Sequence, residues 1–227
     1  PFTTFSVSLT PTNCENGYKS VSNIYDNYIT SGNIVFKIVS KIIWGFNDKD
    51  YSIKLLENIP DNFTGKILDI PTGTGILTYE KYKCLNTAKI ICMDYSNDML
   101  GIAKRRFKNN NLKNIECKQG DVGNIPFENE TFDMVLSMNG FHAFPDKEKA
   151  FIEIKRILKN NGYFIGCFYA KGITKRTDWF INKIFVKNGT FTPPFYNKTE
   201  IMEKLNKDYK ELEIWNVGSI ICFKCRK

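Results

Sequence analysis

Short apolar runs alternate with amphipathic stretches through the middle of the chain. Each apolar run is long enough for one buried strand, and the stretches between them repeat their apolar residues at helical spacing. Such alternation predicts a mainly parallel sheet with helices on both faces. The predicted strands are 66–70, 88–93, 115–118, 132–138 and 163–169, and the predicted helices are 76–84, 97–108 and 147–159.

The two ends of the chain show a different pattern. Apolar residues at helical spacing predict a helix within 22–46, and a short second helix covers 53–56. Beyond residue 170, Asn216-Val217-Gly218 lies between two apolar runs and predicts a hairpin turn, so the last two strands should be antiparallel. The other elements predicted there are a helix at 174–187, a proline loop at 191–196, a helix at 197–206 and strands at 209–216 and 218–225.

The stretch 66–75, KILDIPTGTG, carries the clearest chemical signal. A buried strand containing Asp69 leads into a tight loop with Gly73 and Gly75, and a helical pattern follows. Glycine lets the backbone approach a ligand closely, and a helix start presents free N–H groups. Phosphate-binding glycine loops do not need an acid such as Asp69, whereas S-adenosylmethionine loops usually have one.

A second acidic residue strengthens this interpretation. Asp94 ends the apolar strand 89–94 and lies 19 residues after Gly75. Nucleotide-binding βαβ units place an acid at about 20 residues from the glycine loop, where it binds the ribose hydroxyls. The alternative is that Asp94 is an acid at the start of the next helix, although Ser96 and Asp98 could also take that position.

A third segment, QGDVGNIPFENETFDMVLSMNGFHAFPD at 119–146, completes the pattern. Together with ILDIPTGTG (67–75), ICMDYSNDML (91–100) and LKNNG (158–162), it resembles the class I S-adenosylmethionine-dependent methyltransferases. The similarity is greatest to the branch with the ubiquinone and menaquinone biosynthesis enzymes. Pro71 departs from that pattern, because the family usually has glycine or alanine there.

The resemblance implies a Rossmann-like, doubly wound α/β sheet of seven strands, mostly parallel with an antiparallel C-terminal hairpin strand. We expect a flexible segment at 1–21 and one domain at 22–227. Within that domain we expect a helical cap at 22–60, a cofactor-binding core at 66–170, and a lid helix, proline loop and hairpin at 171–227.

The resemblance also implies the contacts to the cofactor, S-adenosyl-L-methionine. The acidic residues have separate roles: Asp94 would bind the ribose and Asp121 the adenine amino group, while Asp69 would either order the loop or contact the cofactor's amino group. The remaining cofactor-binding residues expected are Gly73, Thr74, Gly75, Tyr95, Met99, Val122, Ser137 and Met138.

Methyl transfer from a sulfonium gains most of its rate from proximity and desolvation, so a catalytic dyad is not required. His142, the single histidine, follows the fourth predicted strand and is the candidate general base or substrate contact. The alternative is a loop histidine bonded to the backbone. Tyr25, Tyr28, Trp44 and the aromatic loop 191–195 are candidates for the roof of a pocket that encloses a small, largely apolar or aromatic acceptor.

Charge and cysteines change this picture little. The net charge of +8 would suit nucleic acid or an acidic membrane surface, but lysines are spread along the chain, so we expect a small-molecule substrate and no nucleic acid. No stretch is long and apolar enough for a membrane span. Seven scattered cysteines favour a cytoplasmic protein, and Cys222-x-x-Cys225 lies within a predicted strand, which favours ordinary strand cysteines over a metal site.

Two other functions remain open. An NAD-dependent oxidoreductase is one, but Thr78 stands at the third glycine position of its fingerprint. A module that binds S-adenosylmethionine without turnover is the other. A nucleic-acid amino-methyltransferase is disfavoured, because Thr192-Pro-Pro-Phe195 is far from the fourth strand.

Overall fold

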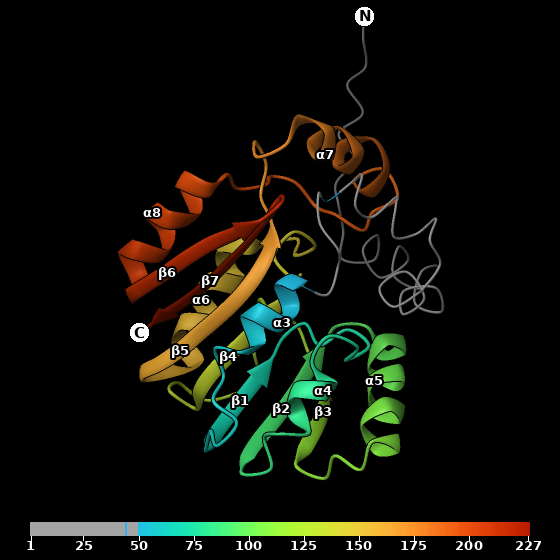
Figure 1. The fold of residues 1–227 in the computed structure, drawn as a ribbon, viewed down its shortest axis with the longest axis vertical. Coiled ribbons are helices and arrows are strands. Elements are labelled where there is room, and N and C mark those ends of the chain that lie inside the picture. The colour runs from blue at the N-terminus through green and yellow to red at the C-terminus, as the bar shows by residue number, and fades with distance from the viewer. Residues whose placement is uncertain (1–43, 45–49) are drawn as a thin grey trace, which may run out of the picture.

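The computed structural model describes Trp44 and residues 50–227, which form one seven-stranded sheet flanked by helices (Figure 1). The strand order is β3-β2-β1-β4-β5-β7-β6; β1 to β5 are parallel, and β7 lies antiparallel between β5 and β6. The expected fold class is confirmed. The strands are β1 (Gly65–Asp69), β2 (Ala88–Asp94), β3 (Ile115–Gln119), β4 (Phe132–Met138), β5 (Leu158–Tyr169), β6 (Lys210–Val217) and β7 (Ile220–Arg226).

The helices cover both faces of the sheet, as the alternating pattern predicts. They are α3 (Asp50–Leu56), α4 (Tyr79–Tyr82), α5 (Asn97–Asn109), α6 (Lys147–Ile157), α7 (Lys175–Phe180), the π-helix η1 (Ile181–Phe185) and α8 (Lys198–Asp208). Buried residues of α3, α4 and α5 pack with one face of the sheet, and those of α6 and α8 pack with the other. Successive strand residues divide between the two cores: Ile67 belongs to the first and Leu68 to the second.

The largest differences from the predicted element boundaries are in three places. The helix at 76–84 is regular only over α4, and the helix at 174–187 is divided into α7 and η1. β5 begins at Leu158, not at 163, because Leu158 pairs with Phe132 of β4. The backbone N–H groups of Asn161 and Lys227 also form hydrogen bonds with Lys227 and Gly162, respectively. These partners are distant in sequence, so local periodicity did not show them.

The C-x-x-C pair lies in β7, as predicted for strand cysteines. Cys222 belongs to the core beneath α3, α4 and α5, whereas Cys225 belongs to the core beneath α6 and α8. Side chains three positions apart in a strand point to opposite faces, so these two thiols cannot bind one ion. In the described part of the chain, no helix has the length and hydropathy needed to cross a bilayer.

The expectations for residues 1–21, for the helix at 22–46 and for Tyr25 and Tyr28 lie outside the described residues.

Candidate functional site

One pocket opens at the carboxyl ends of the strands, where β1, β2, β3 and β4 each end in a loop. Ligands of open α/β sheets bind at this edge. Nine of the residues expected to bind cofactor line it: Asp69, Gly73, Thr74, Asp94, Tyr95, Met99, Asp121, Val122 and Met138. The pocket therefore brings together side chains from four separate loops.

The two glycines of the loop after β1 have different surroundings. Both have positive φ, +59° at Gly73 and +70° at Gly75. A Cβ at Gly75 would lie 2.6 Å from Cζ of Phe107 in α5, whereas a Cβ at Gly73 would meet no atom within 4 Å. Gly75 is therefore required by packing, and Gly73 keeps the pocket side of the loop open. Of the two, only Gly73 is among the lining residues.

Asp94 connects the glycine loop to the start of α5. Its Oδ2 accepts the Gly73 N–H at 2.7 Å, and its Oδ1 accepts the Ser96 N–H at 2.9 Å. Burial raises the pKa of Asp94 to about 6, although these N–H groups oppose the shift. The helix cap itself is Ser96, whose Oγ accepts the Met99 N–H. Asp94 is thus not needed as the cap, and its carboxylate faces the pocket.

Asp69 lies deeper, at the end of β1. Its side chain is 1% exposed, and Oδ2 accepts the Tyr82 hydroxyl at 2.7 Å and the Thr78 hydroxyl at 3.4 Å. Burial raises the pKa of Asp69 to about 7, and the charge of Asp94 contributes in the same direction. The two carboxylates therefore resist simultaneous ionisation unless a cation enters the pocket.

The far wall of the pocket is formed by the loop after β3 and the start of α5. Asp121 is exposed, and its Oδ1 accepts the Gly123 N–H at 2.8 Å, while the Val122 side chain is buried. Met99 is buried in α5, whereas Tyr95 is 45% exposed at the rim. This wall offers one carboxylate beside apolar surface, which suits a flat polar ring.

Three expected site residues are not among the pocket-lining residues. Gly75 packs against Phe107. Ser137 is fully buried in β4, and no described group forms a hydrogen bond with its Oγ. His142 follows β4 and is discussed next.

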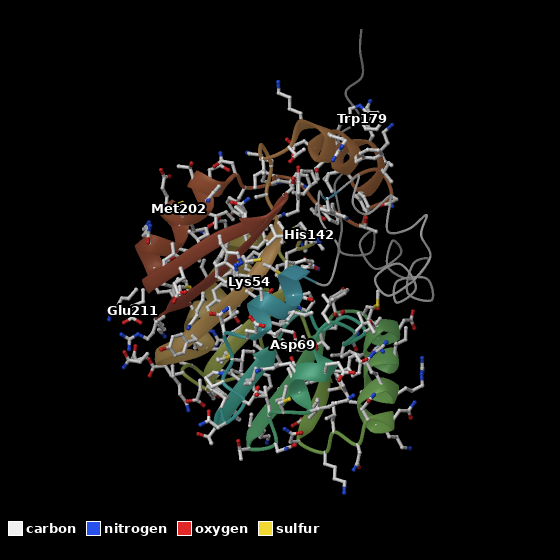
Figure 2. All side chains as sticks on the ribbon, viewed as in Figure 1. Lys54, Asp69, His142, Trp179, Met202 and Glu211 are labelled. Atoms are coloured by element: carbon white, nitrogen blue, oxygen red, sulfur yellow. The ribbon has the colours of Figure 1, made fainter. Side chains whose placement is uncertain are left out.

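The His142 ring lies on the other side of the loop between β4 and α6. Figure 2 shows Asp69 near the end of β1 and His142 closer to the end of β5. Nδ1 of His142 accepts the Tyr169 backbone N–H at 3.3 Å, and the ring stacks on Phe191 with centroids 3.9 Å apart. Burial lowers the pKa of His142 to about 3, and Lys147 adds to the shift. The ring is therefore neutral at physiological pH and carries its proton on Nε2.

The same loop separates the cofactor pocket from a cluster of aromatic side chains. Ala143, Phe144 and Pro145 line the pocket, while His142 contacts Phe191 on the opposite side. The members of the cluster, called here the aromatic cluster, are Trp44, Tyr169, Phe185, Phe191 and Phe195.

Hydrogen bonds attach the loop at 191–195 to the loop after β4. The Thr192 N–H donates to the His142 carbonyl at 2.8 Å, and the Thr192 carbonyl accepts the Lys147 ammonium at 2.6 Å. The two loops therefore form one wall between the pocket and the aromatic cluster.

Several lining residues were not predicted from the sequence. Thr72, Thr78 and Ser96 belong to the pocket, and Tyr82 supports it from behind through Asp69. A signal existed for two of them, because Thr78 and Tyr82 are one helical turn apart and both follow the acidic strand. Asn139 also lines the pocket directly after Met138, and it forms hydrogen bonds with Tyr51 and Cys167 from distant parts of the chain.

Comparisons with known proteins agree with this arrangement. Residues 67–162 match the methyltransferase domain family. The demethylmenaquinone methyltransferase of Lactococcus lactis is 32% identical over 146 residues, which cover 64% of this chain and 54% of that protein. The enzyme of the same name from Thermotoga maritima is 27% identical over 76% of this chain and 78% of its own length. The chain thus spans about half the length of the Lactococcus relative.

Solved structures show the same fold at low sequence identity. A phosphoethanolamine N-methyltransferase of Haemonchus contortus, in complex with S-adenosyl-L-methionine, has a TM-score of 0.74 at 15% identity, over 98% of this chain and 60% of that one. A Thermotoga maritima methyltransferase, described as a possible histamine N-methyltransferase, has a TM-score of 0.68 at 19% identity, over 94% and 99%. Together with the acidic glycine-loop pocket, these matches support a class I S-adenosylmethionine-dependent methyltransferase domain that includes residues 67–162.

Proposed function

We propose that this protein transfers a methyl group from S-adenosyl-L-methionine to a small, largely apolar or aromatic acceptor. The observation that carries the proposal is the convergence of Asp69, Asp94 and Asp121 on one pocket beside the open face of Gly73. A dinucleotide would bring two negative phosphates to this pocket, whereas a sulfonium cofactor brings positive charge.

The pocket fits that cofactor through its acidic groups. Asp94 has lone pairs left after accepting the Gly73 and Ser96 N–H groups, and these would accept the ribose hydroxyls. Asp121 and the Val122 N–H would bind the adenine edge, with Met99 against the ring face. Asp69 would attract the ammonium group, which favours the ionised carboxylate despite burial. Thr74, Tyr95 and Met138 would complete the contacts.

Bound S-adenosylmethionine supplies an activated methyl group, so the chain's own residues need mainly to orient the acceptor and exclude water. We place the acceptor on the pocket side of the wall formed by the loops at 140–146 and 191–195, with the aromatic cluster supporting that wall from behind. Within the single domain proposed at 22–227, residues 22–60 and 171–227 would cover the core at 66–170 as cap and lid. Enclosure by aromatic side chains favours an apolar acceptor over a nucleic acid strand.

His142 fits a supporting role behind the wall better than general base catalysis. A base needs a free lone pair, and Nδ1 already accepts the Tyr169 N–H. The remaining Nε2–H is a donor, and the ring stacks on Phe191 on the aromatic side of the loop. Gly75 and Ser137 would act indirectly, by shaping the loop and the end of β4.

Calorimetry tests the cofactor half of this proposal. We expect S-adenosylmethionine and S-adenosylhomocysteine to bind and NAD not to bind. Binding of NAD alone would overturn the proposal in favour of an oxidoreductase.

An acceptor panel tests the other half. Reduced prenylated quinones, simple phenols, small amines and a short RNA should be offered with labelled cofactor, and we expect label in an apolar aromatic acceptor. Cofactor binding with no transfer to any member would favour a module that binds S-adenosylmethionine without turnover. Transfer to RNA alone would overturn the enclosed-acceptor proposal.

A further inference from the structure

Two pairs of cysteines face each other across neighbouring strands of the sheet. Cys92 of β2 is the register partner of Cys117 of β3, and Cys167 of β5 is the register partner of Cys222 of β7. All four are free thiols. Neighbouring strands lie about 4.8 Å apart, which is inside the range of about 4.4–6.8 Å between the Cα atoms of disulfide-bonded cysteines. Both pairs are therefore close enough to be joined.

The pairs differ in access. Cys167 and Cys222 are fully buried in the middle of the sheet. Cys117 lies in β3, the edge strand beneath α5 (Figure 1), and its side chain is half-buried, while Cys92 is fully buried beside it. A reagent in solution can therefore react with Cys117 directly. Cys92 can react only after the reagent has become attached to Cys117.

A basic groove surrounds Cys117. The groove lies between the end of α5 and β3, and its lining includes Lys104, Lys108 and Lys113 besides the thiol. None of these lysines forms an ion pair with another residue in the described part of the chain. Hydrogen bonding to Cys92 and the charge of Lys104 lower the pKa of Cys117, whereas burial raises the pKa of Cys92. The outer cysteine therefore ionises more readily than the inner one.

We propose that Cys117 is a modification site for an anionic disulfide of the oxidised-glutathione type, and that Cys92 resolves the resulting mixed disulfide. The groove supplies the charge that such a dianionic tripeptide disulfide needs, and the register supplies the second thiol. Low-pKa, accessible cysteines beside a resolving cysteine are the thiols that react selectively in proteins.

The chemistry balances in two exchanges. The Cys117 thiolate attacks one sulfur of the oxidised tripeptide; a protein–tripeptide disulfide forms, the original disulfide breaks, and one tripeptide thiolate leaves. The Cys92 thiol then loses its proton to the departing tripeptide sulfur and attacks Cys117 Sγ. A Cys92–Cys117 bond forms, and a second tripeptide thiol is released. The oxidant is reduced by two electrons, and the protein is oxidised by two.

Formation of the Cys92–Cys117 disulfide would change the affinity of the cofactor pocket. This consequence rests on the proposed function. Cys92 is also the register partner of Asp69 on β1 and lies two residues before Asp94. A disulfide also requires its own side-chain geometry, and adjusting β2 to that geometry would shift both carboxylates relative to the glycine loop. We expect the oxidised protein to bind S-adenosylhomocysteine about tenfold more weakly, because displaced charged hydrogen bonds are worth about 1.5 kcal/mol or more.

The test treats the full chain with oxidised glutathione under native conditions, blocks the remaining thiols and maps the peptides by mass spectrometry. Wild type should yield peptides joined through Cys92 and Cys117. Cys92→Ser should stop with glutathione on Cys117, and Cys117→Ser should leave Cys92 unmodified. If the Cys92→Ser variant fails to fold, the same experiment is done with Cys92→Ala.

Cys84 is the matched comparison, because it is exposed but is not among the residues that line the groove. Cys117 should react about tenfold faster than Cys84 at low salt, and Lys104→Gln should remove much of that advantage. Equal rates at Cys84 and Cys117, or a Cys167–Cys222 bond forming first, would overturn the proposal.

Affinity is measured on reduced and oxidised protein in parallel. A Cys92–Cys117 bond with unchanged cofactor affinity would contradict the effect on the pocket. Absence of cofactor binding by the reduced protein would count against the proposed function and leave the thiol exchange standing.

Discussion

The cofactor pocket and the aromatic cluster behind its wall are held together by contacts of different range along the sequence. On the cofactor side, Gly73 and Asp94 are 21 residues apart, and Tyr82 and Asp69 are 13 apart. On the aromatic side, Lys147 and Thr192 are 45 residues apart, and His142 and Thr192 are 50 apart. The part of the cofactor pocket that contains Asp69, Gly73 and Asp94 is thus assembled within one βαβ unit and leaves a compact sequence pattern. The aromatic side is assembled from distant segments, so it leaves no such local pattern.

The largest expected effect tests whether the cofactor side depends on one carboxylate. Asp94→Ala should weaken cofactor binding by about 2–4 kcal/mol, since two hydrogen bonds to a charged group are lost. Calorimetry with S-adenosylhomocysteine measures the change. Asp98→Ala is the matched control, because Asp98 is an exposed acid in the same helix start and should have little effect. Equal losses in the two variants would mean that only the general negative field matters.

The second prediction separates packing from ligand access within the glycine loop. Gly75→Ala should destabilise the fold by about 2–3 kcal/mol, since the new methyl would overlap the Phe107 ring at a positive φ. Gly73→Ala adds only the backbone strain, about 1 kcal/mol, but places a methyl on the open side of the loop.

Denaturant unfolding and calorimetry on both glycine variants give the answer. The free energy of unfolding should fall more in the Gly75 variant. The affinity for S-adenosylhomocysteine, measured where both variants are folded, should fall more in the Gly73 variant. The reverse order would show that Gly75, not Gly73, faces the ligand.

The third prediction concerns pH. Asp94 has a raised pKa of about 6, and ribose hydroxyls bind its ionised form. Cofactor binding should therefore lower that pKa and release protons near pH 6. Affinity should be constant above this value and fall as pH decreases through it, by up to about tenfold per unit.

The neighbouring acid has to be removed for this measurement. Asp69 has a pKa of about 7, so its ionisation extends the pH range over which affinity changes to higher pH. The Asp69→Asn variant therefore isolates the effect of Asp94. Adding Asp94→Asn to that variant should give a flat profile between pH 5 and 8; a remaining step near pH 6 would point to another group.

The smallest expected effect lies on the aromatic side. His142→Ala should lower turnover by less than about tenfold, because a base contributes about 10²–10⁴-fold and this ring is a neutral donor. The turnover profile should show no step from His142 between pH 6 and 8, since its pKa is near 3. A loss of a hundredfold or more, with unchanged cofactor affinity, would restore the general base.

The sequence predicted the cofactor side well because its information is local. Nine expected residues line the pocket, and each lies in or beside a strand end visible as an apolar run. Whether they bind cofactor remains a prediction. His142 shows the limit: its position after β4 was clear, but its partners Tyr169 and Phe191 come from β5 and a later loop. The start of β5 at Leu158 was missed for the same reason, because its partner Phe132 is 26 residues away in the chain.

The strand order has a consequence for biosynthesis. β7 comes last in the sequence but occupies an interior position, between β5 and β6. While β7 is still within the ribosome, the β5 edge exposes unpaired backbone groups beside the apolar residues Phe164, Ile165 and Phe168. The nascent chain therefore has an unpaired, aggregation-prone strand edge until translation of β7 is finished. Termination of translation within β7 would release a chain with this edge unpaired, which is prone to aggregate.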